Sequence, residues 1–331
     1  MIDYRQIFND FSNLESLNTN ENTYNVISLP LMSHKLGMSR EGFPMFFVST
    51  TDDDCGTNII REILLVEYDV ECTIKEYDGS SFGNKFSIIT LRTLDKCLQS
   101  YFVDIFLMML GKMVEIPSKH GLSVEVERLV SIFSALTSAP RKKIQGLWAE
   151  LLVIEQSKDP GLLINAWHSS TSSKYDFTLG RDKIEVKSTS SEERVHRFSL
   201  DQLNPSPNSR LLIASVVVRE SGQCLQGLSI KNLYDRICLV ISELESKIRL
   251  YTIIAQTLGK DIDKIEKEYY DYVAAVDSLS YYNFEDVPRI LKNNVPISVT
   301  DVKFSCNITK TESIKELNCS LNDSELFKSL F

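Results

Sequence analysis

The sequence has no hydrophobic run long enough to cross a bilayer, which argues against a helical membrane protein. Its most apolar stretch, residues 101–110, is short and is interrupted by Asp104. The first residues, Met1–Arg5, lack the basic-then-apolar pattern of a secretory signal peptide. We therefore expect a soluble, cytoplasmic protein with no membrane partner.

Paired cysteines and nucleotide-binding signatures are also missing. The seven cysteines are odd in number, and none are spaced as a CxxC pair. This favours free thiols in a reducing compartment over a disulfide framework or a structural zinc site. We find no P-loop, no dinucleotide-binding glycine pattern, no nucleophile elbow and no kinase signature. The chain therefore carries no motor motif of its own.

The charge of the chain is unevenly distributed. With 331 residues, 43% of them hydrophobic, the chain can form one large or two modest domains with a real core. The net charge of −9 argues against a protein that coats nucleic acid indiscriminately. Residues 141–219, however, contain 12 basic and 9 acidic residues, a net charge of about +3. This middle segment is the better candidate to face a phosphate backbone.

Hydrophobic periodicity predicts an α/β protein in three parts. We expect a β-rich domain over residues 1–120, a core with a leading helix over 121–220, and a mainly helical extension with late strands over 221–331. In the first part, the expected strands are Tyr24–Leu31, Pro44–Thr50, Arg61–Tyr77 and Lys85–Leu91, followed by two helices within residues 94–138.

The middle part is expected to begin with a helix from Pro140 to Gln156. Strands are then expected at Leu163–His168, Asp176–Leu179 and Lys183–Ser188, followed by a short helix Ser199–Leu203 and a buried strand Arg210–Val218. In the last part, we expect helices within residues 230–258 and 261–268, and strands at Asp271–Asp277 and Pro296–Thr309.

Residues 176–187 carry the pattern that points to chemistry. Gly180 and Arg181 fit a two-residue type II′ hairpin turn. In that register Asp176 lies opposite Glu185, and strand alternation puts Lys187 on the same face. Two facing carboxylates repel each other unless a cation lies between them, and hard oxygen ligands suit Mg²⁺. The metal would activate a water nucleophile, and Lys187 would orient that water or stabilise the transition state.

A third carboxylate is expected from the preceding helix. Glu150 lies on or beside the apolar stripe that includes Leu147, Leu151 and Ile154. A carboxylate that faces a core must be paired or bound to metal, because burying it alone is too costly. We therefore expect Glu150 to hold a ligand water or a second metal ion, although a structural pair with an arginine is the alternative.

Together these residues resemble the PD-(D/E)XK superfamily of restriction and repair nucleases. The helix glutamate Glu150, then Asp176, then the Glu185-x-Lys187 strand follow the order of that pattern. More narrowly, the chain resembles a bacterial family of PD-(D/E)XK motif proteins. The similar runs are Gly146–Leu152, Trp167, Asp176–Phe177, Glu185–Thr189, His196–Ser199, Gln202–Leu203 and two later stretches near residues 287 and 295. Tyr175 departs from the pattern, since the superfamily name places a proline there.

The resemblance implies a restriction-endonuclease-like core (αβββαβ) on a mixed sheet. It also implies Mg²⁺ dependence, with Mn²⁺ able to substitute, and DNA as the substrate in restriction or anti-phage defence. By analogy with such nucleases, a homodimer and partner proteins of a defence system are candidate assemblies. The position of Gln202 fits a glutamine found near the active site in some relatives.

One histidine, one arginine and two lysines each have two possible roles. His196 and Arg197 either contact phosphate or lie on a loop surface. Lys142 and Lys143 open a helix, where cations oppose the dipole. This hints at an anionic partner such as DNA, although a solvated helix end is the more common case.

We therefore expect a Mg²⁺-dependent endodeoxyribonuclease. The main alternative is a catalytically silent subunit that binds DNA or serves assembly within a larger defence complex. A nuclease acting on RNA or on a particular nucleic-acid structure is a further alternative, because the same residues can attack either backbone.

Overall fold

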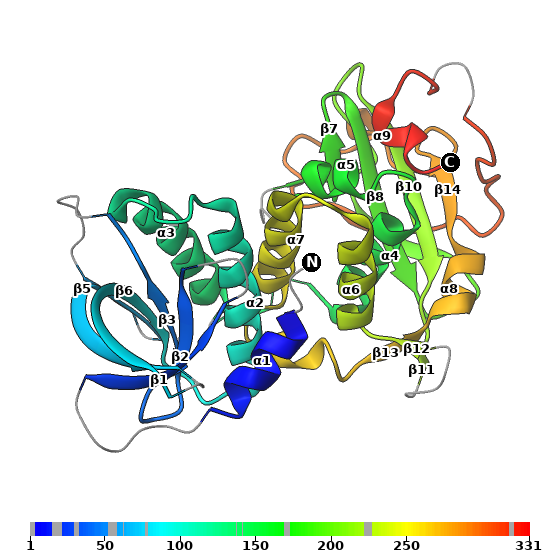
Figure 1. The fold of residues 1–331 in the computed structure, drawn as a ribbon. Helices are drawn as coiled ribbons and strands as arrows, with labels where there is room; N and C mark the ends of the chain where they lie inside the picture. Colours follow the sequence, from blue (N-terminus) through cyan, green and yellow to red (C-terminus); the bar gives the residue numbers. More distant parts are fainter. Residues whose placement is uncertain are drawn as a thin grey trace. The chain divides into compact units, whose positions relative to one another are not determined.

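The computed structural model describes residues 4–14, 22–29, 33–51, 58–61, 63–76, 79–136, 138–140, 142–168, 173–221, 227–317 and 321–331. The chain forms two compact units, Met1–Ala135 and Leu136–Phe331 (Figure 1). No helix in the described parts is long and apolar enough to span a membrane.

The first unit is a strongly curved sheet with helices. Its elements are α1 (Tyr4–Ser12), β1 (Thr23–Ser28), β2 (Lys35–Met38), β3 (Pro44–Val48), β4 (Ile59–Ile60), β5 (Leu64–Lys75), β6 (Ser81–Leu91), α2 (Lys96–Lys112) and α3 (Lys119–Ala135). The strand order is β1-β2-β3-β6-β5-β4, and β1 also pairs in parallel with β5. This extra pairing closes five strands into a ring, and β5 and β6 bend sharply to allow it (Figure 1).

The alternation of side chains explains this architecture. Phe46 of β3 contacts Phe102 and Phe106 of α2 edge-on, so one face of the sheet packs on the helices. Phe47, the next residue, points to the inside of the ring, where it packs with residues such as Ile74 and Phe86. Every residue of β3 is therefore buried, because the strand has a core on both faces.

The second unit has a central sheet of strand order β14-β10-β8-β7. Its elements are α4 (Ile144–Gln156), α5 (Pro160–Ala166), β7 (Phe177–Leu179), β8 (Asp182–Thr189), β9 (Val195–Ser199), β10 (Arg210–Val217), β11 (Glu220–Ser221), β12 (Gly227–Leu228), α6 (Ile230–Val240), α7 (Leu244–Leu258), η1 (Gly259–Lys264), β13 (Tyr269–Asp271), α8 (Tyr272–Ser278), β14 (Ser280–Asn283), η2 (Lys292–Asn294), β15 (Lys303–Asn307) and α9 (Glu325–Lys328). Strands β8 and β10 are parallel along their full length, and α4 packs against β8.

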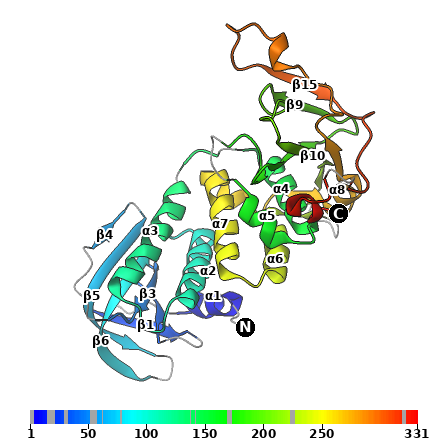
Figure 2. The same cartoon turned by 90° about the horizontal axis from the view of Figure 1, so that it is seen from above.

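A two-stranded ribbon completes this unit. Strand β9 pairs antiparallel with β15, about a hundred residues later in the chain (Figure 2). Three small strands, β11, β13 and β12, form another short sheet. The ribbon brings residues 195–199 next to the central sheet, where they border the candidate site.

The expected α/β class with a β-rich N-terminal part is confirmed. The expected strands at residues 44–50, 61–77, 85–91, 183–188 and 210–218 correspond to β3, β5, β6, β8 and β10. The division into three parts stays a prediction. Residues 221–331 contain helices as well as strands, and β14 joins the central sheet beside β10.

Three expected segments are wrong, and in two of them a local cap decides the conformation. Residues 163–168 begin within α5, since Asp159 caps that helix by accepting from the Leu162 N–H and Pro160 occupies its first turn. Most of 271–277 is α8, capped by Asp271. Residues 200–203 form turns instead of a helix, and the strand β9 that precedes them was not expected.

Candidate functional site

The hairpin of β7 and β8 has the expected register. Leu179 pairs with Asp182 and Phe177 with Ile184, so the turn consists of Gly180 and Arg181. Gly180 has a φ of +57°, which a glycine adopts without strain. Asp176 directly precedes β7 and is thereby brought alongside β8.

Asp176, Glu185 and Lys187 are all positioned by this hairpin. The Val186 N–H donates to Asp176 Oδ2 at 2.8 Å and fixes that carboxylate against β8. The Lys187 Nζ lies 2.6 Å from Glu185 Oε1, two residues away on the same face of the strand. Asp176 and Glu185 are 8% and 4% exposed, so both carboxylates have little access to water. Burial makes their hydrogen bonds and ion pairs important.

Glu150 reaches the same place from α4. The residue is buried, as its position on the apolar stripe predicts. The Trp167 indole N–H donates to Glu150 Oε2 at 2.8 Å and orients the carboxylate. Trp167 is fully buried, and its ring stacks on Phe177 of β7. The alternative of an arginine partner for Glu150 is wrong: the cation beside it is a lysine.

That cation is Lys142. Its Nζ lies 2.7 Å from Glu150 Oε1 and 2.6 Å from Asp176 Oδ1, between the two carboxylates. Helix α4 starts at Ile144, with Lys143 as its N-cap, so Lys142 belongs to the segment before the helix and folds back over it. The reading of Lys142 as a solvated helix end is therefore wrong, because its ammonium is the counter-ion of two buried acids.

Burial changes the protonation of these acids. Burial, followed by repulsion from Asp176, raises the pKa of Glu150 to about 7, although Lys142 opposes the shift. The same two causes raise the pKa of Glu185 to about 8 against the attraction of Lys187. Burial thus disfavours the ionised forms of Glu150 and Glu185, and a bound cation would favour those ionised forms.

Gln202 joins the site from the turn after β9. Its Nε2 donates to Glu185 Oε1 at 2.6 Å, and its Oε1 accepts from the Ser199 N–H at 3.1 Å. Lys187 Nζ lies 3.4 Å from the same Oε1. The amide therefore holds Glu185 and Lys187 in place from the side, and this network supports a positioning role.

The remaining candidates are arranged differently. His196 is buried in β9 with its Nε2 2.7 Å from Ser215 Oγ, and burial lowers its pKa to about 4, so the ring is neutral. It is not on a loop surface. Arg197, the next residue, is exposed, as is Lys143. Both border an open cavity of about 770 Å³ that also contains Lys142, Glu150, Asp176, Glu185, Lys187 and Gln202.

The oxygens of the site suit a hard divalent cation. Within the described ranges, no three His, Cys, Asp or Glu side chains gather closely enough to hold a metal ion as they stand. However, Glu150 Oε1 and Asp176 Oδ1 converge on one point, the Lys142 ammonium. Two carboxylate oxygens that share a cation are the ligands Mg²⁺ prefers. The residues therefore fit a metal, provided that Lys142 moves aside.

Sequence reasoning missed two contributors to this site. Lys142 was expected either as a contact for an anionic partner or as a solvated helix end, and Trp167 belonged to one of the similar runs. Neither role has a local signal, because each contact joins segments 8 to 34 residues apart. The one available hint was that a buried Glu150 requires partners.

A family model described as "Putative PD-(D/E)XK family member" (DUF4420) matches residues 9–309. No curated protein and no solved structure matches the chain. The match extends well before residue 120, where the sequence-based resemblance begins, and it spans both compact units. On this match, the chain belongs to the PD-(D/E)XK-type family DUF4420.

Proposed function

We propose that this protein is a metal-dependent endonuclease that hydrolyses phosphodiester bonds of DNA. The observation that carries the proposal is the convergence of Glu150 Oε1 and Asp176 Oδ1 on one cation position, beside the Glu185–Lys187 pair. Family membership supports the same reading, because nucleases are common in the PD-(D/E)XK superfamily. The proposal includes restriction or anti-phage defence as the context, which the resemblance of the sequence implies.

Each residue has a distinct role in this proposal. Asp176, Glu185 and Glu150 would hold Mg²⁺ or Mn²⁺, and Trp167 and the Val186 N–H would keep two of these carboxylates oriented. The bound metal would supply Lewis acidity and a nucleophilic water. Lys187 would place its positive charge beside the phosphate oxygens as they gain negative charge, held in position by Gln202.

The walls of the cavity suit a phosphate backbone. Lys143, Lys174 and Arg197 border the opening, so positive charge flanks the buried acids. Lys142 could follow the substrate, because 40% of its side chain is exposed and its ammonium can turn from the carboxylates to a phosphate. We extend the proposal to a restriction-endonuclease-like core in which α4 precedes the β7–β8 hairpin and β10 runs parallel to β8.

The direct test is cleavage of unmodified plasmid and phage DNA by the wild-type chain, Asp176→Ala and Lys187→Ala. We expect cutting with Mg²⁺ or Mn²⁺, no cutting with EDTA, and at least a roughly 100-fold lower rate in either variant. Lys183→Ala is the matched control, since this lysine lies on the same strand but bonds the Gly180 carbonyl at the hairpin turn. Duplex, single-stranded, branched and RNA substrates identify the preferred backbone.

Lys142 supports a second candidate function. An ammonium that already neutralises Glu150 and Asp176 is what a catalytically silent DNA-binding or assembly subunit would need. This candidate predicts salt-sensitive DNA binding without cleavage under any metal. Such a result would refute the stand-alone nuclease, whereas metal-dependent cutting lost in Asp176→Ala would refute the silent subunit. A homodimer able to cut both strands is tested in the same preparations by sedimentation.

A further inference from the structure

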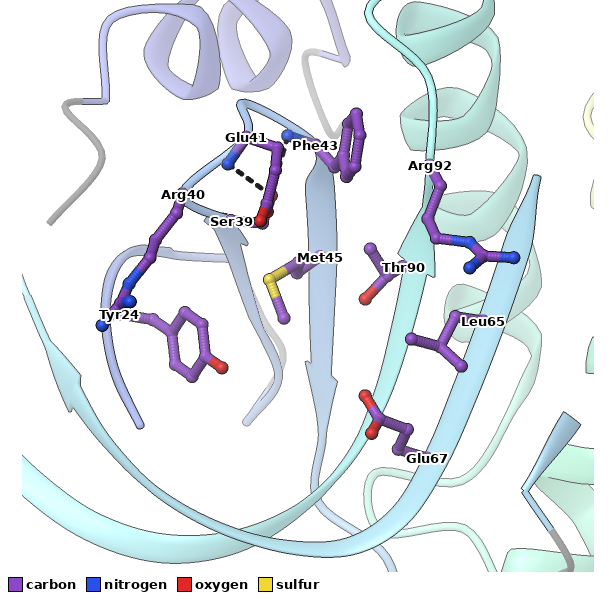
Figure 3. A pocket seen from close by; sticks show the side chains of 10 residues that line it. All are labelled: Tyr24, Ser39, Arg40, Glu41, Phe43, Met45, Leu65, Glu67, Thr90 and Arg92. Atoms are coloured by element: carbon purple, nitrogen blue, oxygen red, sulfur yellow. Dashed lines mark hydrogen bonds between the residues drawn. The ribbon is translucent and has the colours of Figure 1, made fainter. Parts of the chain in front are cut away.

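The closed ring of strands in the first unit has an unfilled end. Its interior is packed by apolar side chains such as Val26, Phe47 and Ile88. At one end, however, a cavity of about 400 Å³ opens between strands β1, β3, β5 and β6 and the β2–β3 turn (Figure 3). Its lining residues are Tyr24, Ser39, Arg40, Glu41, Phe43, Met45, Leu65, Glu67, Thr90 and Arg92. The mouths of β-barrels are frequent sites for small ligands.

The floor of this cavity is apolar except for one hydroxyl. Met45, Thr90 and Leu65 lie directly opposite one another on β3, β6 and β5, so they share one face of the sheet. Thr90 is 5% exposed, and its Oγ1 has no hydrogen-bond partner within the described part of the chain. Buried hydroxyls are nearly always hydrogen-bonded, so this one indicates a partner outside the chain.

Two more polar groups point into the same space. Figure 3 shows the Tyr24 hydroxyl pointing into the opening from one side and the Glu67 carboxylate from the other, with Thr90 on the same side as Glu67. No hydrogen bond or ion pair joins either group to another described residue. Burial raises the pKa of Tyr24, so its hydroxyl stays protonated and can donate. The cavity therefore offers a donor, an anionic acceptor and a hydroxyl.

The other polar side chains of the lining are already engaged, apart from Arg40. Ser39 Oγ donates to Glu41 at 2.9 Å. The Arg92 guanidinium turns away from the cavity and donates to the Arg61 carbonyl (Figure 3). Arg40, in contrast, is exposed at the mouth and forms no ion pair with a described residue. Inside the cavity thus lie polar groups that have no hydrogen-bond partner among the described residues, and at its entrance lies a cation that has no ion-pair partner among them.

This arrangement matches a nucleotide with its base inside. A carboxylate accepts from the exocyclic amino group of cytosine or adenine, and an aromatic ring such as Tyr24 offers a stacking surface. A guanidinium binds phosphate with two parallel hydrogen bonds. We propose that the cavity binds an amino-bearing nucleobase of unstacked DNA, with Glu67 on the amino group, Thr90 on the ring edge and Arg40 on the phosphate. This proposal rests on the closed ring of strands in the first unit and does not require that the second unit cleaves DNA.

Calorimetric titration of the full chain carrying Asp176→Ala tests the proposal without any cutting. The probes are dCMP, dTMP and inorganic phosphate; dCMP and dTMP share the pyrimidine ring and differ in the amino against the carbonyl group at C4, in the proton on N3 and in the methyl group at C5. We expect dCMP to bind at least about tenfold more tightly than dTMP, and inorganic phosphate not to bind measurably. Saturable dCMP binding that is equal for dTMP or is reproduced by phosphate alone would overturn the proposal, as would no binding at all.

Matched variants localise the effect. Glu67→Gln should weaken dCMP binding at least about tenfold and reduce the preference over dTMP, because a neutral amide with one acceptor oxygen replaces a charged carboxylate with two. Glu71→Gln is the control, since Glu71 is on the same strand with 80% of its side chain exposed. Thr90→Val should also weaken binding with little change in shape. Equal effects of Glu67→Gln and Glu71→Gln would place the binding elsewhere and sink the proposal.

A second set of titrations distinguishes DNA from free nucleotides as the ligand. A cytosine-containing single strand should bind at least as tightly as dCMP and lose affinity in Arg40→Ala, because the strand adds phosphate contacts. Tight dCMP binding with no binding of the strand would overturn the assignment to DNA and leave a free mononucleotide as the ligand. The wild-type chain is tested for DNA cleavage in parallel. If it cleaves DNA but dCMP does not bind, the proposal for this cavity is wrong and the proposed nuclease is not affected.

Discussion

Replacing Lys142 by methionine tests the charge balance of the candidate site most directly. The substitution keeps an unbranched apolar stem, one heavy atom shorter, and removes an ammonium that lies 2.7 Å from Glu150 and 2.6 Å from Asp176. The carboxylate side chains are only 5% and 10% exposed, so they would be left buried and repelling each other. Losing one partner of a fully buried pair costs about 3–5 kcal/mol.

Solvent reduces this cost. Because 40% of the Lys142 side chain is exposed, we reduce the figure to about 2 kcal/mol. For a unit of this size, that corresponds to a fall in Tm of roughly 4–8 °C. The loss should be largest near pH 8 and smaller at pH 6, because Glu150, with its pKa raised to about 7 by burial, then takes up a proton.

The assay is thermal unfolding in EDTA and in Mg²⁺ at both pH values, together with calorimetric Mg²⁺ titration. The metal should stabilise Lys142→Met more than the wild type and bind it more tightly, because no ammonium competes for the same oxygens. Lys143→Met is the control, since Lys143 is exposed and caps the helix without a side-chain hydrogen bond. Unchanged Tm in EDTA at pH 8, or equal Mg²⁺ affinity, would refute the reasoning.

Three further predictions concern the second unit. In EDTA, the free energy of unfolding should fall as pH rises from about 5 to 8. Burial raises the pKa values of Glu150 and Glu185, so the folded state binds more protons than the unfolded state in this range. A free energy of urea unfolding that does not change with pH would contradict this. Trp167→Phe should lower the free energy of urea unfolding by about 2 kcal/mol and weaken Mg²⁺ binding about tenfold, since the 2.8 Å hydrogen bond from the indole N–H to Glu150 is lost. Unchanged stability together with unchanged Mg²⁺ affinity would exclude an orienting role of Trp167. Gly259→Ala should lower the free energy of unfolding by about 3 kcal/mol, because the new Cβ would lie 2.2 Å from the Ser138 carbonyl oxygen and the residue has a φ of +51°. Gly146→Ala is the control and should be neutral or stabilising, since no atom lies within 4 Å of the added Cβ. Similar Tm changes in both variants would disprove the clash.

The sequence alone determined the local geometry of the hairpin. Strand alternation and the need for a positive φ at Gly180 set which residues face each other, and both act over a few residues. The apolar run of β10 likewise indicated a strand buried on both faces. The same rules failed for residues 163–168 and 271–277, where the caps Asp159 and Asp271 outweighed β propensity.

Only the tertiary structure decided which groups complete the site. Lys142 and Trp167 reach the acids from two different segments, and their side chains take these positions because buried carboxylates must be paired. The ring of the first unit depends on a parallel pairing of β1 with β5, in which Thr23 pairs with Thr73, fifty residues later in the chain. No local pattern encodes such a closure, because it follows from the curvature that lets two apolar faces be buried at once.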